Sequence, residues 1–197
     1  MQPVFYSIKA PSEGLYKEKG SKFLSFAFPV STETEIRDIL ERFKKDYYDA
    51  RHICYAYRIG FSEQKFRAND AGEPAHTAGD PIFNQIKSFD LTNTIVIVVR
   101  YFGGTKLGKS GLIQAYKTAA EEALKNAEKI EVTEQVEFTV TFEYEKMNDI
   151  MKVLKSFSID FVHQDFQAVC SMTVRATKND SEVLVQQLTP HSKSIDL

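Results

Sequence analysis

The sequence has little of several features that would settle the class of a protein at once. Its longest uninterrupted apolar run extends only from Ile95 to Val99, whereas a membrane-spanning helix needs about 20 such residues. No charged start is followed by an apolar core and a small-residue cleavage site. We therefore expect no secretory signal, no membrane contact and a cytoplasmic location.

Cysteine is also scarce. Only Cys54 and Cys170 are present, each within an apolar, strand-like stretch, and no Cys-x-x-Cys pair occurs. This spacing gives no support to a zinc knuckle. We expect two buried free thiols without a disulfide partner, and we predict no metal and no cofactor.

A marked excess of either charge is absent too. The chain of 197 residues carries 25 basic and 27 acidic side chains, and 43% of its residues are hydrophobic, as in ordinary globular proteins of one or two domains. Residues 1–128 have a net charge of +2 and residues 129–197 of −4. Charge alone therefore does not indicate a nucleic-acid binder, although it leaves room for a local basic patch.

Hydrophobic periodicity predicts alternating strands and helices in the first part of the chain. A helix over 31–50 is expected to begin at Ser31 or Thr32 and to bury one apolar stripe. The predicted elements are strands at 4–8, 14–19 and 22–30, the helix over 31–50, a strand at 52–60, a loop over 68–81, a helix at 81–89, a strand at 93–102 and a long helix after the glycines that follow it.

A second unit is predicted to begin near residue 130, where that long helix ends and the charge shifts. We expect a strand at 136–144, a helix at 145–157, strands at 158–164 and 166–178 with a turn at about Asp165, and a helix at 180–188. This order is typical of a two-layer, ferredoxin-like α+β domain. The predicted domains are residues 1–130 and 131–197.

One segment matches the phosphate-loop pattern of nucleotide hydrolases. Gly103 is followed, after four residues, by Gly108, Lys109 and Ser110. Such an enzyme also needs a later apolar strand that ends in Asp to help hold magnesium, and the nearest candidate, residues 157–160, is a poor one. A pattern with four free positions is weak evidence alone, so we do not favour an ATPase or GTPase.

The same segment has two other interpretations. A tight turn from strand to helix would explain Gly103 and Gly104. It explains less well why Arg100, Lys106 and Lys109 gather around them, which an anion-binding site would account for. We expect that site to comprise Arg100, Gly103, Gly104, Lys106, Gly108, Lys109 and Ser110.

The loop at 68–81 carries three weak candidates for catalysis. Asp70, Glu73 and His76 could form a polar site, with Glu73 or His76 as proton acceptor. The alternative, which we favour, is that Asp70 makes an Asx-type turn and that Glu73 pairs with a nearby arginine.

Two further pairs of residues are ambiguous. His52 and Cys54 share one face of a strand and could form a nucleophilic pair, but a satisfied histidine beside a small buried thiol is the commoner arrangement. Tyr101 and Phe102 could stack on bases. Because they follow five aliphatic residues, we expect them, and Phe102 especially, to lie in the core.

Two long motifs resemble a known family. RYFGGTKLGKSGLIQAY at 100–116 and DAGEPAHTAGDP at 70–81, supported by SKF at 21–23 and RHICYAYRIG at 51–60, resemble the signatures of the IMPACT/YigZ family. The resemblance implies an α+β protein. Its N-terminal domain would be similar to the second domain of ribosomal protein S-five, and its C-terminal domain to the ferredoxin-like terminal domain of elongation factor G.

The resemblance also implies a function. Eukaryotic relatives look like translational regulators that relieve starvation-triggered inhibition of initiation by competing for a scaffold protein, and bacterial relatives look like nucleic-acid or ribosome binders. Departures from the family pattern are Ala71 for a common Asp, His76 for Gly, Ser110 for Gly and Gln114 for Arg. These departures weaken the case for a metal-binding pair of carboxylates and remove one positive charge from the expected anion-binding surface.

From these observations we expect a non-catalytic translation- or stress-linked factor that binds RNA, the ribosome or a translation-associated protein. Arg51, Arg58 and Arg67 could widen its anion-binding surface. The alternative is a protein, and even an enzyme, that binds a small phosphorylated ligand or nucleotide in a groove between the DAGEP and GGTKLGKSG loops. A third option is protein binding through the acidic C-terminal domain.

Overall fold

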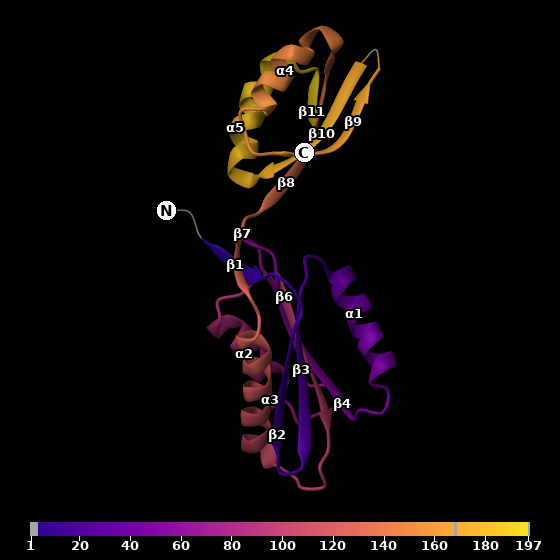
Figure 1. Ribbon diagram of the computed structural model, residues 1–197, viewed down its shortest axis with the longest axis vertical. Coiled ribbons are helices and arrows are strands. Elements are labelled where there is room, and N and C mark those ends of the chain that lie inside the picture. Colours follow the sequence, from indigo (N-terminus) through magenta and orange to yellow (C-terminus); the bar gives the residue numbers. More distant parts are fainter. Residues whose placement is uncertain (1–3, 168, 197) are drawn as a thin grey trace. The chain divides into compact units, whose positions relative to one another are not determined.

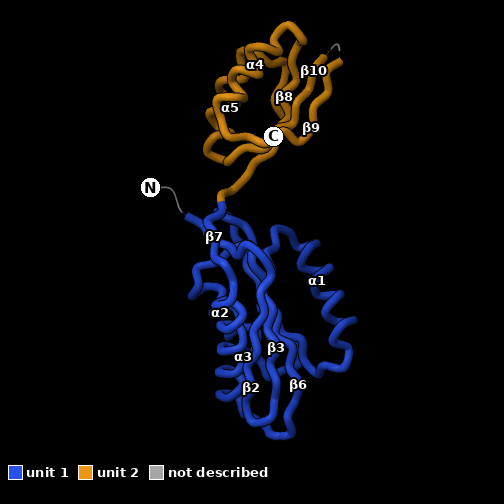
Figure 2. Tube along the Cα trace, in the orientation of Figure 1, with its two compact units in different colours: residues 1–132 blue, residues 133–197 orange. Residues whose placement is uncertain are grey.

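The computed structural model describes residues 4–167 and 169–196. The chain divides into two compact units, one ending at Val132 and one beginning at Thr133, here called unit 1 and unit 2 (Figure 2). Each unit has a hydrophobic core of its own, so each is described by itself. Within the described part of the chain, no helix is long and apolar enough to cross a membrane.

Five antiparallel strands form the main sheet of unit 1, in the order β2-β3-β6-β4-β5 (Figure 1). Their bounds are Ser12–Glu18 for β2, Ser21–Pro29 for β3, His52–Ile59 for β4, Lys65–Asn69 for β5 and Thr94–Tyr101 for β6. The central strand β6 is buried from Thr94 to Arg100. Strands covered on both faces have near-continuous apolar sequences, which explains the run at Ile95–Val99.

Helices cover both faces of this sheet. On one face, α1 (Glu33–Asp46) packs its predicted apolar stripe against the side chains of β6. On the other face lie α2 (Gly79–Ser88) and α3 (Gly108–Lys125) (Figure 1). Of the two predicted caps of α1, Thr32 is the one observed, since its hydroxyl oxygen accepts the Glu35 N–H at 3.2 Å.

A separate two-stranded sheet joins the two ends of unit 1. β1 (Phe5–Ile8) pairs antiparallel with β7 (Lys129–Val132). The pairing continues at Lys9, whose N–H donates to the Glu128 carbonyl at 2.9 Å and whose ammonium group pairs with the Glu128 carboxylate at 3.0 Å. We call this sheet the terminal clasp of unit 1.

The predicted loop over 68–81 was too long at both ends. Ala68 and Asn69 belong to β5, where they pair with Ala56 and Tyr55, and the chain is already helical from Gly79. β5 was missed because it is an edge strand with an exposed, polar sequence. The loop that remains, residues 70–78, is called the acidic loop below.

Unit 2 is a four-stranded antiparallel sheet in the order β11-β8-β10-β9, packed against two helices. Its elements are β8 (Gln135–Glu143), a 3-10 turn at Tyr144–Lys146, α4 (Met147–Leu154), β9 (Asp160–Phe166), β10 (Val169–Thr177), α5 (Lys178–Leu188), a 3-10 turn at Thr189–His191 and β11 (Ser194–Asp196). The βαββαβ order confirms the ferredoxin-like α+β class.

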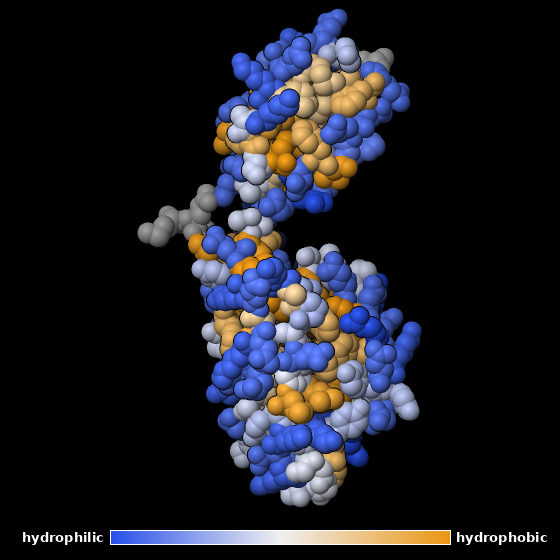
Figure 3. All heavy atoms as spheres, in the orientation of Figure 1, coloured by the Kyte–Doolittle hydropathy of each residue, from blue (hydrophilic) through white to orange (hydrophobic). Residues whose placement is uncertain are grey.

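Two details of unit 2 differ from the prediction. The closing strand β11 was missed because only three residues form it, and Asp165 lies within β9 opposite Ser171 rather than in a turn. The edge strand β9 leaves Phe161, Val162 and Phe166 exposed. Apolar side chains also reach the surface of unit 2 on the face that Figure 3 shows.

Candidate functional site

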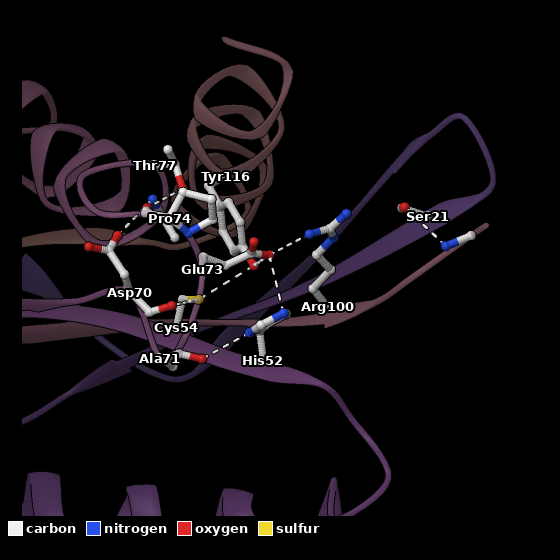
Figure 4. A network of polar contacts seen from close by, with 12 residues as sticks. Ser21, His52, Cys54, Asp70, Ala71, Glu73, Pro74, Thr77, Arg100 and Tyr116 are labelled. Carbon is white, nitrogen blue, oxygen red and sulfur yellow. Dashed lines mark hydrogen bonds and ion pairs between the residues drawn. The ribbon is translucent and has the colours of Figure 1, made fainter. Parts of the chain in front are cut away.

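The site is centred on a buried ion pair between the central strand and the acidic loop. Arg100 lies near the end of β6, between Phe23 of β3 and His52 of β4 in the strand register. Its side chain reaches Glu73, and Nη1 and Oε1 are 2.5 Å apart (Figure 4). Only 6% of Arg100 and 9% of Glu73 are exposed. A buried arginine requires such a partner, so the pair fixes the loop to the sheet.

One carboxylate oxygen of Glu73 collects the neighbouring polar groups. Oε1 also accepts a hydrogen bond from the Tyr116 hydroxyl at 2.8 Å and lies 3.9 Å from Nε2 of His52 (Figure 4). His52 Nδ1 is 2.9 Å from the Ala71 carbonyl and must donate to it, which directs Nε2 toward Glu73. Burial raises the pKa of the Tyr116 phenol far above its usual value, so this hydroxyl remains a donor.

Cys54 belongs to the same network but is not activated. Its thiol donates to the Asp70 carbonyl at 3.0 Å and lies 3.4 Å from the Tyr116 hydroxyl. Burial raises the pKa of this thiol to about 12. The commoner arrangement, a satisfied histidine beside a small buried thiol, is therefore the one observed, because a nucleophilic cysteine must be a thiolate and His52 Nε2 faces Glu73 instead.

Asp70 has a structural role at the start of α2. Its Oδ1 accepts hydrogen bonds from the N–H groups of Ala78 and Gly79 at 2.9 and 2.8 Å, and its Oδ2 accepts one from His76 at 2.9 Å. Burial acts to raise the pKa of this carboxyl, but these N–H groups outweigh it and hold the pKa below its usual value. Asp70 thus caps α2 from outside the helix.

The three candidates for catalysis consequently have different partners. Asp70 bonds the backbone, and Glu73 pairs with Arg100. The exposed ring of His76 pairs with Asp80 at 2.6 Å. His76 also has a φ of 65°, a left-handed conformation that favours glycine.

Two glycines between β6 and α3 are required for different reasons: Gly103 for close packing and Gly108 for its backbone conformation. A Cβ atom on Gly103 would lie 1.9 Å from the Gly20 carbonyl carbon, so only glycine fits against the β2–β3 hairpin. Gly103 N–H also donates to the Ser21 hydroxyl at 3.1 Å. Gly108 has a φ of 70° and open space around it, and α3 begins there.

The N-terminus of α3 opens onto a cavity of about 450 Å³. Among the residues that the structure describes, no side chain caps this end of the helix, and its first turn contains no acidic residue. The acidic loop, β4, β6 and the start of α3 all contribute to the walls. They are lined by Arg51, His52, Glu73, Pro74, Arg100, Phe102, Lys106, Leu107, Gly108, Lys109 and Leu112. We call this space the basic cavity.

Three exposed cations at the basic cavity have no partner among the described residues. Arg51, Lys106 and Lys109 form neither an ion pair nor a hydrogen bond there. The single carboxylate in the lining, Glu73, is already paired with Arg100. The cavity therefore presents unbalanced positive charge beside the positive end of a helix dipole.

The structure brings together only some of the residues that were predicted to bind an anion. Lys106, Gly108 and Lys109 line the cavity, but Arg100 is neutralised in its floor, and Gly103, Gly104 and Ser110 do not line it. Of the three arginines expected to widen the surface, only Arg51 lines the basic cavity. Arg58 bonds Gln64 at 2.8 Å and the Leu91 carbonyl at 3.3 Å, whereas Arg67 lies beside Glu33 and Arg37, toward α1.

Two aromatic residues differ from expectation. Phe102 was expected in the core, but it is 48% exposed and lines the basic cavity, with the Arg100 guanidinium carbon 5.6 Å from its ring centre. It follows the last residue of β6, so the strand's burial ends before it. Tyr101 is half-buried, and its hydroxyl donates to Asp49 at 2.9 Å.

The role of the Tyr116 hydroxyl was not predicted. In the sequence, Tyr116 belongs to the apolar face of a helix, and nothing there indicates that its hydroxyl binds Glu73.

The surrounding sheet does not support the phosphate-loop interpretation. Both neighbours of β6, the strand before the loop, are antiparallel to it, whereas phosphate-loop hydrolases are built on parallel sheets of β-α units. The match at Gly103–Ser110 is therefore not the phosphate loop of a nucleotide hydrolase; it forms the connection from β6 into α3.

Comparisons with known proteins agree with this architecture. The family model of the Impact N-terminal domain matches residues 19–124. IMPACT family member YvyE of Bacillus subtilis is 39% identical over 120 residues, which cover 61% of this chain but only 55% of that relative. IMPACT family member YigZ of Escherichia coli is 29% identical over 167 residues, which cover 84% of this chain and 82% of the relative.

A solved structure described as the crystal structure of a hypothetical protein also matches, with a TM-score of 0.73 and 26% identity. The match covers 96% of this chain and 93% of that one. With the domain match extending across the acidic loop, β6 and nearly all of α3, the chain belongs to the IMPACT family.

Proposed function

We propose that this protein is a non-catalytic, translation-linked factor that binds RNA, and that the basic cavity is its RNA contact. The observation that carries the proposal is the set of unpaired cations, Arg51, Lys106 and Lys109, around one cavity with an exposed Phe102. Cations and an open helix N-terminus bind phosphates, and an exposed ring stacks on bases. The translation link rests on membership in the IMPACT family.

The polar groups beneath the cavity favour binding over catalysis. The Cys54 thiol stays protonated, Asp70 is engaged by three backbone N–H groups, and Glu73 is held by Arg100 and Tyr116. These three groups thus have structural tasks. The cations at the rim are free to contact a ligand.

The proposal can be tested by fluorescence anisotropy with labelled single-stranded RNA over a series of salt concentrations. Wild type is compared with the double variant Lys106→Ala, Lys109→Ala. Loss of two phosphate contacts should weaken binding and lower the slope of log K against log salt by about 1.4. The control variant Lys44→Ala, Lys45→Ala removes equal charge from α1, on the opposite face of the sheet, and should bind like wild type.

Equal binding by wild type and the cavity variant would refute the basic cavity as the RNA contact. Absence of any RNA binding would refute the RNA-binding role itself. A partner retained from an extract after nuclease treatment would then favour a translation-associated protein in place of RNA.

A further inference from the structure

We infer that the basic cavity takes a single nucleoside that carries a phosphomonoester, either as a free nucleotide or as the phosphorylated end of an RNA strand. This inference deepens the proposed RNA contact and, for the RNA source, rests on it. Three properties of the cavity carry the argument: its size, the charge at its rim and the acceptor in its floor.

The size of the cavity suits one nucleotide rather than a length of strand. About 450 Å³ lies near the lower end of the range for small-molecule sites. The buried side chains of Glu73 and Arg100 form a floor across it. Domains that track single strands instead hold about four or more nucleotides in a groove, which is more than the basic cavity alone can hold.

The charge at the rim favours a phosphomonoester over a phosphodiester. Lys106 and Lys109 flank the start of α3 and Arg51 completes the unpaired set. A terminal phosphate carries about −1.5 to −2 charges at neutral pH, against −1 for an internal diester. Three cations and the uncapped N–H groups of α3 therefore match the terminal group better.

The floor of the basic cavity offers a hydrogen-bond acceptor for the ligand. All side-chain hydrogen bonds and ion contacts that Glu73 makes with the described residues involve Oε1, so its Oε2 is left as an acceptor. Phe102, Leu107 and Leu112 supply apolar surface in the same cavity. A ligand that fits has an anion at one end, an apolar flat body, and an N–H or O–H donor, which is the chemistry of a nucleoside phosphate.

The test compares RNAs that differ only at one end. Ten-nucleotide RNAs of one sequence carry a 5′-phosphate or a 5′-hydroxyl with the fluorophore at the 3′ end, and a second pair carries a 3′-phosphate or a 3′-hydroxyl with the fluorophore at the 5′ end. At constant salt, at least one phosphorylated RNA should bind about tenfold more tightly than its hydroxyl counterpart. Unlabelled AMP should displace it, and adenosine should not.

Variants assign the effect to the cavity. Lys106→Ala with Lys109→Ala should abolish the preference for the phosphorylated RNA. Phe102→Ala should weaken the binding of both AMP and RNA. The Phe102 side chain is half exposed, so its loss leaves the core intact. The Lys44→Ala, Lys45→Ala control on α1 should retain the preference.

The possible outcomes separate this inference from the proposed function. RNA binding that ignores the end group and AMP overturns the inference and leaves the RNA contact standing. Binding of AMP without RNA supports the inference with a free nucleotide as its source and overturns the RNA-binding role. Binding of neither refutes both.

Discussion

Removing one partner of the ion pair between Glu73 and Arg100 should strongly destabilise unit 1. In Glu73→Leu the Arg100 guanidinium, 6% exposed, would remain buried without its carboxylate. Removing one partner of a buried pair costs about 3–5 kcal/mol. Tyr116 would also lose its acceptor, at a cost of about 1–3 kcal/mol that partly overlaps with the first. Against a total stability of about 5–15 kcal/mol, this variant should be close to unfolding.

Urea unfolding of the full chain, followed by tyrosine fluorescence, measures this effect. Eight of the nine tyrosines lie in unit 1 and the chain has no tryptophan, so the signal reports on this unit. The double variant Glu73→Leu, Arg100→Met leaves no charge buried and should recover most of the loss, with about 1–3 kcal/mol remaining for Tyr116. A loss below about 1 kcal/mol in Glu73→Leu, or no recovery in the double variant, would refute the reasoning.

Two further predictions concern the acidic loop and the buried thiol. Because the pKa of Asp70 is lowered on folding, its stabilising effect is present above its usual value of 3.8 and is lost as the pH falls through the folded value. Asp70→Asn should lower the free energy of unfolding by about 1–2 kcal/mol at pH 7. Between pH 5 and pH 3 the free energy of unfolding should fall less in this variant than in wild type. Equal decreases in the two proteins would contradict the capping role of Asp70. Since burial raises the pKa of Cys54 to about 12, native protein at pH 8 should alkylate there on the order of a thousandfold more slowly than urea-unfolded protein. Mass spectrometry of the Cys54 peptide measures this, and similar rates in both states would show that the thiol is accessible and activated.

The sequence identified those elements whose pattern is strong by itself. The apolar run before Arg100 marked β6, and the spacing of Ile36 and Phe43 marked α1. β5, β7 and β11 were missed because a strand at an edge, or one of three or four residues, takes its conformation from its neighbours in the sheet rather than from its own residues.

The site was less accessible to prediction, because burial and partnership decide what each side chain does. Lys106 and Lys109 could be found beside the glycines. The favoured pairing of Glu73 with an arginine is confirmed, but nothing local shows that this arginine is Arg100. Phe102 was assigned to the core because aliphatic residues precede it, although the strand ends one residue earlier. The hydroxyl of Tyr116 was hidden within the apolar face of α3.

The terminal clasp also constrains when unit 1 can be completed during synthesis. β1 is made first, yet its partner strand β7 is the last element of the unit to be made. Until β7 emerges, β1 has no partner for its ladder, and the most non-local contacts of the unit are missing. Since non-local pairing slows folding, closing the clasp should be the late step, and a chain interrupted before Lys129 would leave an open strand edge prone to wrong pairing.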